Sequence, residues 1–259
     1  MLTAAAVCPH PPLLIPEATG APGAGDVELG RLRAACDQAV AALLAGRPDL
    51  IVVVGTDQKT ARAREYPPDA TASLHEFGVP LTVGAPPASQ GGPPASQGGP
   101  PGRLGGSPVL PLSLTIGKWL LSRAAAGPGA PRAAWWAIAA GAATAQCLEL
   151  GRRLAALAPR VALLAMGDGP GRRARGAPGA ADPEADRYDD QVAAALAAAD
   201  PGALAALDPG QDGRLFIAGR AAWQVLAGAA GQDPFDADLL YRGVPYEVTY
   251  LVSSWRRRP

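Results

Sequence analysis

The chain has 259 residues, of which 48% are hydrophobic and 18% are charged, and its 23 basic side chains balance 23 acidic ones. This composition excludes a chain kept disordered by its charge and a protein that binds nucleic acid electrostatically, so we expect a small molecule or another protein as partner. A chain of this length can form one sizeable core, and we therefore expect a single domain over residues 1–259.

Features that would direct the chain to a membrane or an oxidising compartment are missing from the sequence. No apolar run reaches the roughly 18 residues that span a bilayer, and residues 1–7 lack the basic start and long apolar stretch of a signal peptide. The three cysteines have neither an even number nor a zinc-binding spacing, which predicts small buried side chains. We therefore expect a cytoplasmic protein that does not bind membranes.

The first predicted elements form a strand, a helix and a second strand. Residues 2–7 are an apolar run that ends at Cys8, and the prolines around His10 make the following loop rigid. Apolar residues recur at steps of three and four over 27–44, which predicts a helix. Residues 50–55 are a continuous apolar run, typical of a strand buried on both faces of a parallel sheet. Together they predict a first βαβ unit.

A low-complexity insertion interrupts the chain after a short predicted strand at 79–83. Residues 84–108 are rich in proline and glycine, and the segment PPASQGG occurs at 86–92 and again at 93–99. Burial of these small side chains cannot offset the entropy lost on ordering, so we expect a disordered surface insertion. The alternative is a ligand for a proline-reading domain.

Helical and strand patterns alternate through the second half of the chain. Helices are predicted over 110–126, 143–157, 183–199 and 214–229, and strands over 134–140, 160–166, 237–241 and 246–252. This alternation predicts an α/β sandwich, in which helices flank a central sheet that is mostly parallel or mixed. We interpret the final three arginines, residues 256–258, as a solvated tail.

Polar side chains follow three of the predicted strands. His10 follows the first strand, Asp57 and Gln58 follow the second, and Asp168 follows the strand that ends at Met166. Ligands of open α/β sheets bind beyond the carboxyl ends of the strands, so these four residues form our candidate pocket. His10 suits metal ligation or proton transfer, or else a hydrogen bond in a rigid turn. Each aspartate suits a metal ligand, a general base or the cap of a turn.

Glycine-rich phosphate-binding loops are absent, and we predict no nucleotide cofactor. The segment 167–171 contains Pro170, which removes an N–H group that would face a phosphate. Arg172, Arg173 and Arg175 follow it as a basic cluster that suits either a clamp for an anion or a solvated loop.

Four segments carry a resemblance to a known family. They are CPHPPLLIP at 8–16, VVVGTDQKTA at 52–61, the pair Gly167 and Asp168, and GRAAWQVLAGA at 219–229. With these segments the chain resembles the class III extradiol ring-cleavage dioxygenases, typified by the catalytic β subunit of protocatechuate dioxygenase, with the Memo-like proteins as relatives. The resemblance spans most of the chain outside the insertion and implies the fold of that family.

The resemblance also implies an iron site, which this sequence does not complete. Active members hold Fe(II) with two histidines and one carboxylate, and a further histidine handles protons. His10 matches the first ligand. Gln58 stands where the second histidine is expected, Gly219 where the glutamate ligand is expected, and Pro170 or Gly171 where the acid/base histidine is expected. The resemblance therefore implies the family's fold without its full chemistry.

Three functions follow from this reading. The first is a diverged or non-catalytic homologue that binds a small ligand or a partner. The second is a metal-dependent oxidoreductase, such as a ring-cleaving dioxygenase, or a hydrolase that uses Fe(II) or another divalent metal at a rebuilt site around His10, Asp57 and Asp168. The third is a subunit of a homo- or hetero-oligomer, for example of a heteromeric dioxygenase whose partner carries the iron.

Overall fold

A seven-stranded mixed sheet forms the centre of the protein. The computed structural model describes residues 1–19, 27–83, 103–104, 107–124, 131–171 and 183–259. The strands run in the order β10-β11-β1-β9-β2-β8-β3, and the middle four, β1, β9, β2 and β8, are parallel. Their bounds are β1 Leu2–Cys8, β2 Leu50–Asp57, β3 Arg64–Tyr66, β8 Arg132–Ala139, β9 Val161–Met166, β10 Phe235–Gly243 and β11 Tyr250–Arg257.

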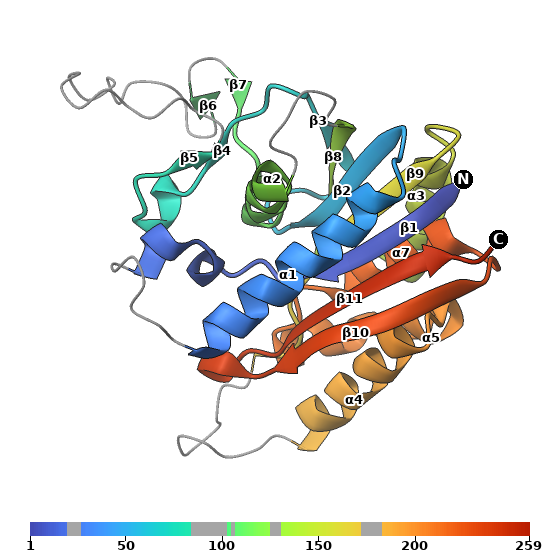
Figure 1. Ribbon diagram of the computed structural model, residues 1–259. Helices are drawn as coiled ribbons and strands as arrows, with labels where there is room; N and C mark the ends of the chain where they lie inside the picture. The colour runs from blue at the N-terminus through green and yellow to red at the C-terminus, as the bar shows by residue number, and fades with distance from the viewer. Residues whose placement is uncertain (20–26, 84–102, 105–106, 125–130, 172–182) are drawn as a thin grey trace.

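Helices cover both faces of this sheet, so the predicted α/β sandwich is confirmed (Figure 1). One face packs against α1 (Val27–Ala45) and α2 (Leu112–Ala124). The other packs against α7 (Arg220–Ala230), which is flanked by α3 (Thr144–Ala155), α4 (Pro183–Ala197) and α5 (Pro201–Ala205). The start of β1 lies near the end of β11, which places the two ends of the chain side by side.

The strand β9 shows why the sheet is buried on both sides. All six of its residues are buried, and their side chains alternate between the two cores. Val161, Leu163 and Ala165 face the core under α7, whereas the residues between them face the core under α1 and α2. Side chains alternate along a strand, so a continuous apolar run provides apolar surface to both helical layers.

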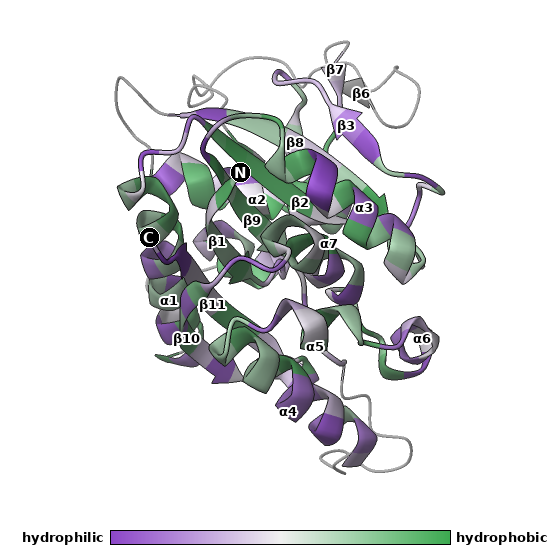
Figure 2. Ribbon diagram, turned by 90° about the vertical axis from the view of Figure 1, so that its right-hand side faces the viewer, coloured by the Kyte–Doolittle hydropathy of each residue, from purple (hydrophilic) through white to green (hydrophobic). Residues whose placement is uncertain are grey.

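The helix α7 is the most deeply buried helix described, because every one of its residues is buried. Figure 2 shows it as a largely hydrophobic helix between α3 and α5. Gly151 on α3 and Gly228 on α7 allow the two helix backbones to touch. A Cβ atom added to Gly151 would overlap the carbonyl oxygen of Val225, and one on Gly228 would overlap that of Leu148.

One charged side chain, Arg220, lies within this apolar layer at the start of α7. Its Nε donates to Asp212 Oδ2 at 2.6 Å, and its Nη1 donates to Gln224 Oε1 at 2.7 Å. Its Nη2 donates to the carbonyl oxygens of Ala140 and Ala142 at 3.0 and 2.9 Å. The guanidinium therefore joins α7 to the turn after β8 and to the short helix α6 (Asp212–Leu215).

Three predictions about individual elements are wrong. Residues 214–229 form two helices, because Phe216 adopts a left-handed backbone with φ 55° and separates α6 from α7. Residues 79–83 contain only the short strand β5 (Thr82–Val83), which pairs with β4 (Ala72–Ser73) outside the main sheet. Arg256 and Arg257 belong to β11 and Arg258 follows it, with Arg257 2.9 Å from Asp233 and Arg258 2.7 Å from Asp236.

Other predictions concern the cysteines, membrane-spanning segments and the low-complexity insertion. All three cysteines are free and buried, as predicted. No helix of the described residues is long and apolar enough to cross a bilayer. Both PPASQGG copies and the arginines at 172, 173 and 175 lie outside the described residues; at the end of the insertion the structure describes β6 (Arg103–Leu104) paired with β7 (Ser107–Pro108).

We expect Gly151→Ala to lower the free energy of unfolding by about 1–3 kcal/mol, because the added methyl group must push α3 away from the backbone of α7. The matched control is Gly30→Ala on α1, where a Cβ meets nothing within 4 Å. That substitution should stabilise the protein by up to about 1 kcal/mol. Urea denaturation measures both, and equal effects at the two glycines would contradict the close helix contact.

We expect Arg220→Met to lower the free energy of unfolding by about 3–5 kcal/mol, because it leaves the partners of a buried charge unpaired. Arg152→Met is the control, since Arg152 pairs with Glu149 on the surface of α3 and its side chain is 60% exposed. Its effect should stay within about 0.5 kcal/mol. A loss below about 1 kcal/mol for Arg220→Met would show that the buried network contributes little.

Candidate functional site

Two of the four candidate residues meet at the carboxyl edge of the parallel strands. His10 follows β1 and Asp168 follows β9, and these strands are neighbours in the sheet. The backbone N–H of His10 donates to Asp168 Oδ1 at 2.8 Å, and His10 Nδ1 lies 3.6 Å from the same oxygen. Both side chains are mostly buried, with exposures of 10% and 15%. The sequence prediction that places them at one edge agrees with this contact.

The loop that carries His10 is held by prolines and by α1. Prolines flank His10 on both sides and limit the backbone to extended conformations before the turn η1 (Pro12–Leu14). Arg33 of α1 then donates from Nε to the carbonyl oxygen of Leu14 at 2.8 Å and from Nη2 to that of Leu13 at 2.9 Å. The imidazole therefore sits on a loop with little freedom to move.

Burial of the pair has its main effect on the pKa of Asp168. Desolvation raises the pKa of Asp168, while the neighbouring His10 acts in the opposite direction through its charge and its backbone hydrogen bond. The ring atom His10 Nδ1 is buried without a hydrogen-bond partner among the described residues. A buried polar atom in this state is uncommon and marks a position where a ligand or water is expected. An imidazole beside a carboxylate can bind a polar ligand or exchange a proton with it.

The other two candidates do not join this pair. Asp57 accepts a hydrogen bond from the backbone N–H of Lys59 at 2.8 Å, which makes it the cap of the turn after β2. Its second oxygen accepts from the hydroxyl of Tyr66 at 3.3 Å. Gln58 is exposed. Within the described part of the chain, no group of three or more His, Cys, Asp or Glu side chains is arranged to hold a metal ion.

The start of α7 closes the same edge of the sheet, through packing that no motif in the sequence indicates. The Thr56 hydroxyl donates to the carbonyl oxygen of Ala218 at 2.9 Å, and the Ala218 N–H donates to that of Asp168 at 3.2 Å. Gly219 packs directly on Gly167, where an added Cβ would lie 2.5 Å from the Gly219 Cα. A Cβ on Gly219 would overlap the indole ring of Trp223, whose buried Nε1 has no hydrogen-bond partner among the residues that the structure describes.

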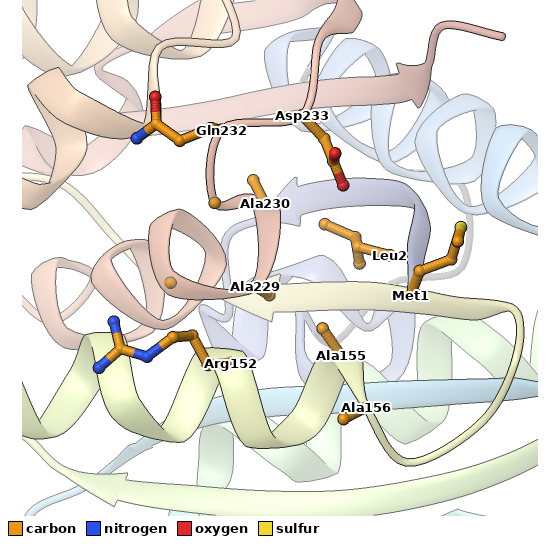
Figure 3. Close-up of a pocket in the computed structure, with 11 residues that line it drawn as sticks. Met1, Leu2, Arg152, Ala155, Ala156, Ala229, Ala230, Gln232 and Asp233 are labelled. Atoms are coloured by element: carbon orange, nitrogen blue, oxygen red, sulfur yellow. The ribbon is translucent and has the colours of Figure 1, made fainter.

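A cavity of about 360 Å³ lies at the opposite end of the sheet, away from the His10–Asp168 pair (Figure 3). It is bounded by the first residues of β1 and by the carboxyl ends of α3 and α7. Small apolar side chains such as Ala155 and Ala229 line it, with Arg152, Gln232 and Asp233 around them. None of the candidate residues from the sequence lines this cavity.

Comparison with known proteins gives a likeness to solved structures. No model of a protein family matches the chain. No curated protein matches it either. Among solved structures, the chain is similar to an uncharacterized protein from Escherichia coli K12, with 16% sequence identity, a TM-score of 0.45, and coverage of 98% of this chain and 99% of that one.

The raised pKa of Asp168 predicts a specific pH dependence of stability. An acid whose folded pKa lies above its unfolded pKa stabilises the fold while it is protonated, and this contribution is lost as the pH rises through the folded pKa. Asp168→Asn keeps an oxygen that can accept from the His10 N–H but carries no charge. Relative to the parent, the variant should therefore gain free energy of unfolding as the pH rises from about 4 to 7.

Denaturant titrations of parent and variant at each pH measure this difference. Titrating groups that do not interact with Asp168 cancel in the comparison, because their surroundings are the same in both proteins. The raised pKa of Asp168 would be contradicted if the difference in free energy of unfolding between variant and parent stayed constant with pH, or if the parent gained stability relative to the variant as the pH rose.

Proposed function

We propose that this chain is a diverged member of the class III extradiol dioxygenase family that binds a small ligand or a partner at the His10–Asp168 pair and does not cleave aromatic rings with iron. The α/β sheet with polar residues at the carboxyl ends of its parallel strands supports a ligand site at this edge. The family membership itself rests on the resemblance of the four sequence segments.

The observation that carries the proposal is the contact between Gly219 and Trp223. The resemblance implies a glutamate ligand at position 219. Glycine has no donor atom there, and any side chain at this position would overlap the Trp223 indole ring. The ring is completely buried and belongs to the core under α7, so it has little room to move aside. The packing around Gly219 therefore leaves no space for the side chain of a glutamate ligand.

The remaining residues do not fit the iron centre that the resemblance implies. A centre with two histidines and one carboxylate needs three ligands on one side of the metal. His10 and Asp168 supply one imidazole and one carboxylate, while Asp57 caps its own turn and Gln58 is exposed. We therefore derive no reaction step through a metal. What the pair offers is a buried imidazole beside a carboxylate, which suits binding of a polar ligand.

The alternative is a metal-dependent oxidoreductase or hydrolase with a rebuilt site around His10, Asp57 and Asp168. Two of these three residues, His10 and Asp168, lie in contact. The approach of His10 to Asp168 at 3.6 Å is the observation in its favour. Asp57 would have to leave the Lys59 N–H and the Tyr66 hydroxyl to join them. The third hypothesis, a subunit whose partner carries the iron, stays a prediction.

Metal titration separates the proposal from the rebuilt site. Under anaerobic conditions we expect the full chain to bind no stoichiometric Fe(II) or Zn²⁺ in equilibrium dialysis, because two protein ligands, His10 and Asp168, give only a weak site. The His10→Ala variant should behave like the parent. One equivalent of metal bound by the parent and lost in His10→Ala would overturn the proposal and favour the rebuilt site.

A further inference from the structure

A second, smaller cavity lies beyond the carboxyl end of β8, at the same edge of the sheet as Asp57, which pairs with Ala139 in the ladder of β2 and β8. Its volume is about 230 Å³. Pockets for drug-sized ligands measure about 300–1,000 Å³, so an occupant of this one must be small. It is lined by Ala63, Ile138, Ala139, Ala142, Gln146, Glu149, Leu150 and Arg153.

The floor of the cavity is apolar and rigid. Ile138, Ala142 and Leu150 are buried members of the core under α7. The turn that contributes Ala142 is fixed from behind by Arg220, which donates to the carbonyl oxygens of Ala140 and Ala142. A surface that is already ordered loses little entropy when a ligand binds, and here it offers contact to a short hydrocarbon group.

The polar rim presents the amide of Gln146 and the guanidinium of Arg153. Gln146 Oε1 accepts from the Ala143 N–H at 3.1 Å, which leaves the amide NH₂ of Gln146 as the available group. The Glu149 carboxylate is neutralised by Arg152, whose Nη2 lies 2.7 Å from Oε2. Arg153 is exposed, and within the described part of the structure its guanidinium makes no ion pair or hydrogen bond.

We propose that this cavity binds a small aliphatic carboxylate, with the carboxylate on Arg153 and the Gln146 amide and the hydrocarbon tail on Ile138, Ala142 and Leu150. Arginine and an amide NH₂ both donate, and a guanidinium pairs with a carboxylate through two parallel hydrogen bonds. A neutral or cationic headgroup would leave the guanidinium of Arg153 unused. None of His10, Gln58 and Asp168 lines the cavity, so this site is independent of the proposed function.

The test is an NMR titration of the full chain with pentanoate, and with pentylamine as a probe that has the same tail and the opposite charge. We expect saturable binding of pentanoate and none of pentylamine. Arg153→Gln should weaken pentanoate binding by at least about tenfold, the usual effect of losing a charge-assisted hydrogen bond. Arg153 is exposed, so this variant should fold like the parent.

Two further variants make the test specific. Arg31→Gln removes an exposed positive charge from α1, outside both cavities, and it should change the affinity less than twofold. Ala142→Leu should fill the floor and abolish binding. The proposal is overturned if pentanoate does not saturate, if pentylamine binds as tightly, or if both arginine variants weaken binding equally. Loss of binding in His10→Ala with no effect of Arg153→Gln would also overturn it.

Discussion

The buried guanidinium of Arg220 is the interaction on which the arrangement of the second half of the chain depends. A charge inside an apolar layer is destabilising by several kcal/mol unless every donor finds a partner. Arg220 meets this condition only when the turn after β8, the helix α6 and Gln224 are all in place. Gln224 in turn donates to the carbonyl oxygens of Ala205 and Leu207. The network therefore gives α7 a single position under the sheet.

That position determines what the carboxyl edge of the sheet can contain. Arg220 directly follows Gly219, so fixing the guanidinium also fixes the glycine against Gly167 and beneath Trp223. Two glycines and an indole ring fill the space beside the end of β9 tightly. The same packing that stabilises the fold leaves no room for a ligand-bearing side chain from α7. His10 and Asp168 then remain as the polar pair at this edge, with a ring nitrogen that lacks a partner.

The edge thus divides into two places with different chemistry. Beside β1 and β9, a buried imidazole and a carboxylate of raised pKa suit a polar ligand. Beside β8, an apolar floor and the guanidinium of Arg153 suit a small anion with a hydrocarbon tail. Strand order keeps them apart, because β9 and β8 lie on opposite sides of β2. Arg220 contributes to both places. It directly follows Gly219, which packs on Gly167 beside Asp168, and it donates to the turn whose Ala142 lines the cavity.

Hydrophobic periodicity determined most of the fold, because the alternation of a buried strand and the three-to-four spacing of an amphipathic helix are local properties of the chain. It predicted the α/β class, the strands β1, β2 and β9, the helix α1, and the common edge shared by His10, Asp57 and Asp168. It missed the break over 216–219, where Phe216 adopts a left-handed backbone and Gly219 precedes the first turn of α7. Periodicity also could not show that Arg257 and Arg258 pair with Asp233 and Asp236, because these acidic partners lie 24 and 22 residues earlier, around the start of β10.

Only the tertiary structure decided which candidates meet. Residues at the ends of parallel strands share an edge whatever the strand order, and the sequence is sufficient for that statement. Contact between two of them requires neighbouring strands, and the pairing of β1 with β9 brings His10 to Asp168. Asp57 is occupied by its own turn, a competition between local and distant partners that spacing does not reveal. The fit of Gly219 under Trp223 and the cavity beside Arg153 likewise arise from side chains packed in three dimensions, which no one-dimensional pattern records.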